Sequence, residues 1–142
     1  MRLTSTAFSH GSEVPQKFTC QGEDINPPLQ WADVPPGAKS FALVVDDPDA
    51  PMGTWIHWLV KDIPVNTASI AEDSIPGVVV SNSFGHPAYG GPCPPSGTHR
   101  YFFKLYALNV PALPAVNARD FYNLVEKHKI AQAVLMGTYQ KA

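Results

Sequence analysis

The chain has 142 residues, about the length of one domain, and this length can bury an ordinary hydrophobic core. Hydrophobic residues make up 44% of it and charged residues only 15%, which is typical of a compact globular protein and excludes a disordered chain. The formal net charge of -2 excludes the basic surface that binding to nucleic acid requires.

The sequence shows no sign of membrane insertion or export. It has no run of about 18 hydrophobic residues, so we expect no transmembrane segment. Residues 1–10 lack the hydrophobic stretch and cleavage site of a secretory signal, so we predict a cytoplasmic location. Cys20 and Cys93 stand outside any CxxC pair, and we expect both to be reduced and structural, although the sequence leaves a single bridge between them open.

Prolines set the expected fold class. The 15 prolines are spread along the chain, and they divide it into short extended segments because proline ends helices and removes a ladder donor. This pattern favours an all-β sandwich or barrel. Neither an internal repeat nor a long linker is present, so we expect one domain over residues 1–142.

The predicted elements follow in chain order. Extended segments are expected at residues 3–8, 17–19, 29–31, 40–46, 55–61, 78–81, 99–108 and 134–140. The run 40–46 is β-branched and aromatic throughout, which is typical of a strand buried on both faces. In 99–108 the residues alternate, with His99 in the inward-facing set at the first position. One helix is expected, capped by Asn117 and ending near His128.

Three clusters contain residues that could take part in binding or catalysis. In the turn 47–51, prolines fix the directions of the Asp47 and Asp49 side chains. The ordinary alternative is an acidic turn that is exposed to solvent and has no role in binding. His57 lies inside a buried-looking strand, where a core histidine with a satisfied hydrogen bond is the ordinary alternative. The loop 89–97 is rich in glycine and proline and leads into a second histidine, so its backbone amides could cradle a small anion.

Taken together and in this order, the motifs resemble those of the phosphatidylethanolamine-binding protein family, and most closely its short prokaryotic branch. The matching segments are NPPLQW at 26–31, DPDAP at 47–51, WIHW at 55–58, YGGPCPP at 89–95, GTHRY at 97–101 and GTY at 137–139. The resemblance implies a mainly-β antiparallel sandwich with one C-terminal helix. It also implies a pocket for phosphate-like anions or phosphorylated headgroups.

The resemblance assigns roles to individual residues. Ligand binding is implied for Asp47, Asp49, His57, Gly90, Gly91, Pro92, His99 and Tyr101, and a structural role for Pro51 and Trp55. The Ala50–Pro51 peptide bond is expected to be cis. Longer animal members add a C-terminal lid helix, and because the chain stops soon after Tyr139 we expect no lid and only weak selection among headgroups.

The resemblance also implies partners. Besides a phosphorylated small molecule or a phospholipid, the partner is expected to be a kinase, as for Raf kinase inhibitor-like members, or a protease. A homodimer is expected as well. A carboxylate in an anion pocket needs a reason, and we expect Asp47 to orient a histidine through a ring N–H bond.

Two enzymatic alternatives remain. One is a hydrolase that uses a metal bound by Asp47, His57 and His99, and the other uses Cys93 or Ser96 as a nucleophile with His99. Against them, the sequence contains no HxxxH or HExxH spacing and no GxSxG elbow. We therefore favour a non-catalytic binding protein with no cofactor and no metal.

Overall fold

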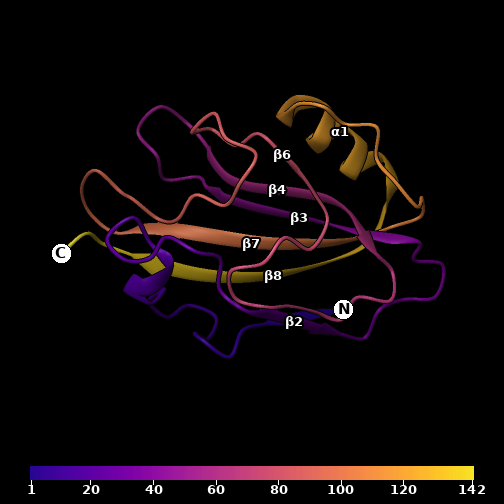
Figure 1. Ribbon diagram of the computed structural model, residues 1–142, viewed down its shortest axis with the longest axis horizontal. Coiled ribbons are helices and arrows are strands. Elements are labelled where there is room, and N and C mark those ends of the chain that lie inside the picture. Colours follow the sequence, from indigo (N-terminus) through magenta and orange to yellow (C-terminus); the bar gives the residue numbers. More distant parts are fainter.

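A computed structural model describes residues 1–142 as two antiparallel sheets, a short 3₁₀ helix and one α-helix (Figure 1). The small sheet has the order β1–β2–β5, with β1 at Arg2–Thr4, β2 at Leu29–Ala32 and β5 at Ser69–Ile70. The large sheet has the order β6–β4–β3–β7–β8. Its strands are β6 at Val78–Val80, β4 at Trp55–Pro64, β3 at Ser40–Asp47, β7 at His99–Leu108 and β8 at Lys129–Tyr139. The helices are η1 at Gln16–Phe18 and α1 at Ala118–His128.

The large sheet is covered on both faces. A core of 20 buried residues lies between the two sheets, and a second core of 9 residues lies between the large sheet and α1. Figure 1 accordingly shows the small sheet on one side of the large sheet and α1 on the other. The central strand β3 is buried along its whole length, as its uninterrupted hydrophobic run predicts. The mainly-β antiparallel sandwich with one helix is therefore confirmed.

The helix forms where its capping residue predicts. The Asn117 side chain accepts a hydrogen bond from the backbone N–H of Asp120 at 2.9 Å, which satisfies one of the free donors of the first turn. Phe121 and Val125 are buried against the sheet. No helix of the structure is long and apolar enough to cross a membrane.

Some local predictions are wrong. Residues 17–19 do not form a strand, because Lys17 and Phe18 belong to the 3₁₀ helix, which the backbone N–H and the hydroxyl of Thr19 close by bonding to the Gln16 carbonyl. The first strand ends at Thr4, since the Ser5 hydroxyl instead binds the Pro28 carbonyl. The two-residue strand β5 carries no pattern long enough to be recognised.

The Ala50–Pro51 bond is trans, as is every peptide bond in the structure, so the expected cis bond is wrong. The turn closes without it: the Asp47 carboxylate accepts the Asp49 N–H at 2.7 Å, and the Gly53 N–H donates to the Ala50 carbonyl at 3.2 Å. The trans isomer is the favoured one even before proline, and nothing in this turn opposes it.

The two cysteines form a disulfide, so the expectation of reduced thiols is also wrong. Cys20 and Cys93 are separated by 73 positions in sequence, and the fold brings their Cα atoms to 5.5 Å. The backbone N–H of Cys20 also donates to the Pro92 carbonyl at 3.1 Å. This pairing depends on where η1 lies against the 89–97 loop. No local sequence pattern predicts that tertiary contact.

Gly137 in β8 allows a close approach between chain segments. A Cβ placed there would lie 2.5 Å from Val14 Cγ2 and 2.9 Å from Phe8 Cε2, inside the core. We expect Gly137→Ala to destabilise the protein by about 1–3 kcal/mol, the usual cost of overpacking. Urea unfolding would measure this difference.

The Val14→Ala background provides the control for Gly137→Ala. Because Val14→Ala removes the nearer of the two atoms that the new methyl group meets, the double variant should lose less stability than the sum of the single losses. Strictly additive losses would show that the strain lies elsewhere.

Candidate functional site

A pocket of about 280 Å³ opens at the end of the large sheet, where β3 ends and β7 begins. Most of its lining is hydrophobic, and four titratable side chains project into it: Asp47, His57, His99 and Tyr101. The remaining lining residues are Ala50, Pro51, Met52, Trp55, Phe84, Cys93, Pro94 and Pro95. All four polar side chains were predicted from the sequence to meet in one site, and the structure brings them together.

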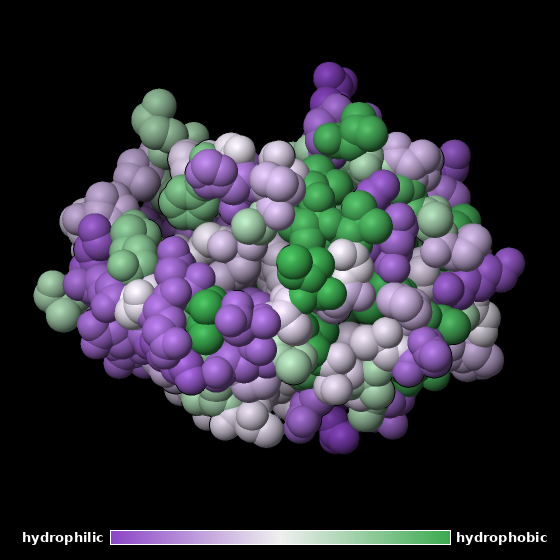
Figure 2. Space-filling model, in the orientation of Figure 1, coloured by the Kyte–Doolittle hydropathy of each residue, from purple (hydrophilic) through white to green (hydrophobic).

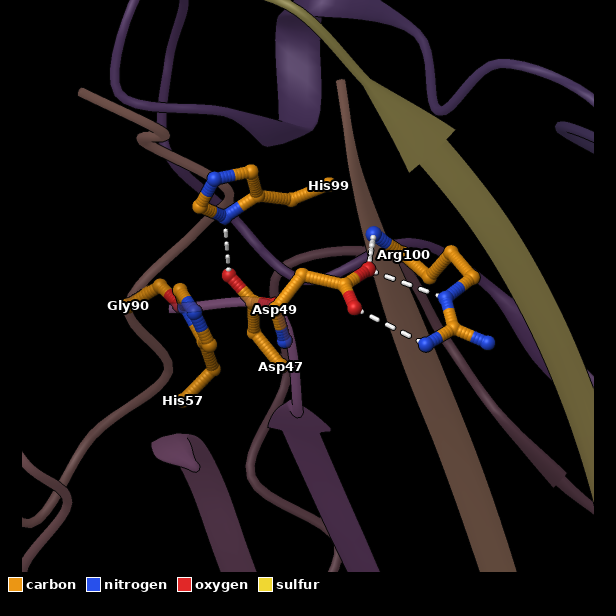
Figure 3. Close-up of polar contacts among 6 residues, drawn as sticks. All are labelled: Asp47, Asp49, His57, Gly90, His99 and Arg100. Carbon is orange, nitrogen blue, oxygen red and sulfur yellow. Dashed lines mark hydrogen bonds and ion pairs between the residues drawn. The ribbon is translucent and has the colours of Figure 1, made fainter. Parts of the chain in front are cut away.

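Asp47 and His99 form a buried hydrogen-bonded pair. Asp47 is the last residue of β3 and His99 the first of β7, and the His99 Nδ1–H donates to the Asp47 carboxylate at 2.7 Å (Figure 3). The second Asp47 oxygen accepts the backbone N–H of Asp49. Both carboxylate oxygens therefore accept hydrogen bonds within the protein. The predicted orientation of a histidine by Asp47 is confirmed.

A β-bulge aims His57 into the pocket. In the β3–β4 ladder Val45 pairs with Trp58 and Asp46 with Ile56, which leaves His57 as the extra residue. A bulge turns a side chain away from simple alternation, so His57 and Trp58 both lie on the side that faces the inter-sheet core.

The backbone around residue 90 fixes the ring of His57. Its Nδ1–H donates to the Gly90 carbonyl at 2.7 Å, and the Gly90 N–H donates back to the His57 carbonyl at 3.0 Å. Burial lowers the pKa of His57, although the Gly90 carbonyl and the Asp47 carboxylate oppose part of the shift. At neutral pH this imidazole is therefore neutral, with its Nε2 lone pair available as an acceptor.

Tyr101 lies between the two histidines. Its ring packs edge-on against His57 at 5.2 Å between centroids and stacks with His99 at 6.5 Å. The hydroxyl is buried and has no hydrogen-bond partner in the protein. Burial raises the pKa of Tyr101, and the Asp47 carboxylate raises it further. The pocket thus contains a phenol that stays protonated and lacks an acceptor.

The arrangement can bind a group at three points. Each histidine uses Nδ1 within the protein and makes no hydrogen bond through Nε2. Neither Nε2 is among the fully buried atoms, and both histidines line the pocket together with Tyr101. A ligand oxygen can accept from the phenol, and from the His99 Nε2–H once that ring is protonated.

The enzymatic alternatives find little support in this geometry. The structure contains no group of three or more His, Cys, Asp or Glu side chains placed to hold a metal ion, so Asp47, His57 and His99 are not such a set. Cys93 is bound in the disulfide and has no thiolate, which makes the Cys93–His99 nucleophile wrong. Ser96 is exposed and does not line the pocket.

Asp49 does not face the pocket, although the sequence grouped it with the ligand contacts. Its carboxylate makes two hydrogen bonds with the Arg100 guanidinium, at 2.8 and 2.9 Å, and accepts the Arg100 backbone N–H at 2.9 Å (Figure 3). These bonds fasten the turn after β3 onto the start of β7. Asp49 is therefore a positioning residue for the Asp47–His99 pair.

The 89–97 loop forms a wall, but not the expected cradle of amides. The Gly90 N–H binds the His57 carbonyl, and the Gly91 N–H binds the Asp24 carboxylate at 2.7 Å. Both donors are thus used within the protein. Glycine is required because a Cβ at residue 90 would meet the Phe84 ring at 2.6 Å, and one at residue 91 would collide with the Phe18 carbonyl. Neither Gly90, Gly91 nor Pro92 lines the pocket.

Hydrophobic residues surround the mouth. Trp55, predicted as structural, packs edge-on against Phe84 with centroids 5.4 Å apart. Both are partly exposed, and Met52 is 96% exposed. The sequence analysis did not predict Phe84 and Met52 as pocket residues, because neither belongs to a recognised motif. A hydrophobic rim above a polar floor favours a ligand with one charged end.

The family assignment follows from the whole chain together with this site. A family model described as phosphatidylethanolamine-binding protein matches residues 4–140. The chain belongs to this family. Among related sequences, a UPF0098 protein of Chlamydia pneumoniae is 47% identical over 150 residues, with 100% of both chains covered.

Two crystal structures have the same fold as this phosphatidylethanolamine-binding protein family member. CT736 of Chlamydia trachomatis, described as a PEBP homologue, aligns with a TM-score of 0.93 and 43% identity, over 99% of this chain and 97% of that one. YbcL of E. coli, described as a new member of the mammalian PEBP family, aligns with a TM-score of 0.93 and 32% identity, over 99% and 98%. The likeness therefore extends over nearly the full length of each chain.

The Asp49–Arg100 pair predicts a pH-dependent effect on stability. Hydrogen bonds from the Arg100 guanidinium lower the pKa of Asp49 to about 2, from an ordinary value of 3.8. The ionised carboxylate therefore stabilises the fold above about pH 4, and this contribution is lost as the pH falls through 2. Asp49→Asn should lower the urea midpoint at pH 6, and the difference from wild type should shrink at pH 2.

The matched control is Asp33→Asn. Asp33 is exposed and makes no ion pair, so this variant should follow the wild type at both pH values. An Asp49→Asn deficit that is equally large at pH 2 and pH 6 would contradict the ion-pair explanation.

Proposed function

We propose that this protein is a non-catalytic binding protein whose pocket takes a phosphate-like anion, carried by a small molecule or a phosphorylated headgroup. The observation that carries the proposal is the buried Tyr101 hydroxyl, which has no partner and lies beside two histidines whose Nε2 atoms are free. A buried donor without an acceptor costs about 1–3 kcal/mol. A ligand oxygen would recover that cost.

The shape of the pocket supports a ligand with a polar end and an apolar neighbour. The volume of about 280 Å³ suits a headgroup-sized molecule. Its walls come from prolines, Met52, Trp55 and Phe84, which would contact the part of the ligand beyond the anion. This division agrees with either a phosphorylated metabolite or the headgroup of a phospholipid.

Binding without catalysis is the better account of these side chains. The only candidate hydroxyl nucleophile that lines the pocket is Tyr101, and burial keeps it protonated by raising its pKa. His57 donates its Nδ1–H to a carbonyl, and His99 donates its own to Asp47, so neither ring is placed to activate a serine or a cysteine.

Other inferences about the biology stay predictions. Inhibition of a kinase or a protease, the homodimer and the cytoplasmic location each require a separate measurement: an inhibition assay, sedimentation at micromolar concentration, and cell fractionation. A disulfide such as Cys20–Cys93 is typical of proteins in oxidising compartments, and it weighs against the cytoplasmic location.

Tyr101→Phe separates binding from folding. Because the variant loses a hydroxyl that has no partner, it should be as stable as wild type or more so. Its affinity for phosphoethanolamine should fall by about 0.5–1.5 kcal/mol, the net value of one hydrogen bond. Titration calorimetry and urea unfolding measure the two effects.

Tyr106→Phe is the control, because Tyr106 lies on the same strand but packs on the helix side, away from the pocket. It should not change the affinity. Unchanged affinity in Tyr101→Phe would remove the central support for an anion site.

Substitution of His99 tests its role in the pocket. His99→Gln keeps a donor for Asp47 but loses the imidazole Nε2, which makes no hydrogen bond within the protein. This variant should bind phosphoethanolamine more weakly by roughly 1.5–3 kcal/mol, as measured by titration calorimetry.

The matched control is His128→Gln, because His128 is half-buried and lies outside the pocket. This variant should bind as tightly as wild type. Equal affinities of His99→Gln and wild type would show that His99 does not contact the ligand.

A further inference from the structure

The Cys20–Cys93 disulfide joins a wall of the pocket to the exposed surface of the protein. Cys93 and the two prolines that follow it in the 89–97 loop line the pocket. Cys20 lies on the neighbouring 18–24 segment and is exposed. Both segments lie at the left end of Figure 1, where the surface in Figure 2 is mostly hydrophilic. A small reductant can therefore reach this bond from the solvent.

This disulfide is the main anchor of the loop at the point where the loop lines the pocket. None of residues 93–97 makes a backbone hydrogen bond. The hydrogen bonds of residues 89–92 come before this stretch, and the next one, from the Thr98 hydroxyl to Gln140, comes after it. Within 93–97 the S–S bond is therefore the only covalent or hydrogen bond to another part of the chain.

The anchored stretch also faces the Tyr101 hydroxyl. Burial raises the pKa of Tyr101 and the Asp47 carboxylate raises it further, whereas the Cys93 backbone N–H opposes part of the shift because it lies close to the phenol oxygen. Reduction would release Cys93 from Cys20 and leave this N–H free to move relative to the hydroxyl. The state of the disulfide thus affects the surroundings of the group on which the anion site depends.

We propose that the Cys20–Cys93 disulfide regulates the pocket: the oxidised protein binds a phosphate-like anion, and the reduced protein binds it more weakly. The inference rests on the proposed anion-binding function and adds regulation of the same site. The bond can be reached from the solvent, it anchors the pocket-lining stretch, and that stretch faces Tyr101. A wall that is ordered in advance favours binding, because the ligand then does not have to order it.

Reduction of the bond requires a dithiol. One thiolate of the dithiol attacks a sulfur of the disulfide, the S–S bond breaks, and a mixed disulfide forms. The second thiolate of the reductant then displaces the protein sulfur, so that the reductant leaves as its own disulfide. Two electrons pass to the protein, and two protons complete the thiols of Cys20 and Cys93.

Titration calorimetry with phosphoethanolamine at pH 7 tests the proposal. It compares oxidised wild type, wild type reduced with dithiothreitol, and the variant Cys20→Ser/Cys93→Ser, which cannot form the bond. We expect the reduced protein and the variant to bind about five- to thirtyfold more weakly than the oxidised protein, since ordering one freed backbone residue changes an equilibrium constant by about that factor. Dithiothreitol should not change the affinity of the variant.

The reverse effect must have the same size. If reduction weakens the binding of phosphoethanolamine by a given factor, saturating phosphoethanolamine must favour the oxidised form by that same factor. Equilibration of wild type in dithiothreitol buffers, with and without phosphoethanolamine, measures this effect as a fall in the reduction potential of about 30 mV for each factor of ten. The measurement uses only wild type, so it does not depend on the folding of a variant.

Val14→Ala is the control for general destabilisation, because Val14 is fully buried in the core and does not line the pocket. In its oxidised form this variant should bind phosphoethanolamine as tightly as wild type. An equal loss of affinity in oxidised Val14→Ala and in reduced wild type would overturn the proposal, because lower stability would then explain both.

The remaining outcomes separate the regulation from the anion site. Equal affinities of oxidised and reduced wild type, or a reduction potential that does not shift with phosphoethanolamine, overturn the redox proposal and leave the anion site standing. Loss of the folded circular dichroism spectrum on reduction also overturns it, because the bond then holds the whole fold. If oxidised wild type does not bind phosphoethanolamine, the anion site itself is wrong, and its regulation fails with it.

Discussion

The hydrogen bond between Asp47 and His99 is the contact on which the site depends. It joins the end of β3 to the start of β7, and the Asp49–Arg100 pair beside it fastens the turn after β3 to the start of β7. The preceding residue, Asp46, points to the opposite face, where it binds Lys104 and the Tyr122 hydroxyl of α1. Two adjacent carboxylates thus attach the pocket to one face of the sheet and the helix to the other.

The pocket obtains its binding character from groups whose protonation is set by burial. Tyr101 stays protonated and His57 stays neutral because both are removed from water, and each is held at a fixed distance by its neighbours. His99 is the remaining group, and it is exposed to the pocket through Nε2 alone. A site built in this way combines a protonated phenol with a neutral imidazole acceptor.

The loop that closes the site is organised by side chains far from the motifs. Asp24 receives the Gly91 N–H, the Tyr89 hydroxyl donates to the Phe18 carbonyl, and the disulfide joins Cys20 to Cys93. All three contacts connect the 18–24 segment with the 89–93 loop. One wall of the pocket is therefore fastened to the 18–24 segment by three separate contacts.

The sequence by itself determined the fold class, the central strand, the helix with its Asn117 cap and the grouping of Asp47, His57, His99 and Tyr101, because these follow from local periodicity, capping and recognisable motifs. Only the tertiary structure decided the trans bond at Pro51, the disulfide, the outward role of Asp49 and the use of the Gly90 and Gly91 amides within the protein. The disulfide, the Asp49–Arg100 pair and the Gly90 and Gly91 hydrogen bonds join residues 33 to 73 positions apart, and the residues of the turn at Pro51 allow either peptide-bond isomer. Contacts of that kind leave no periodic trace along the chain.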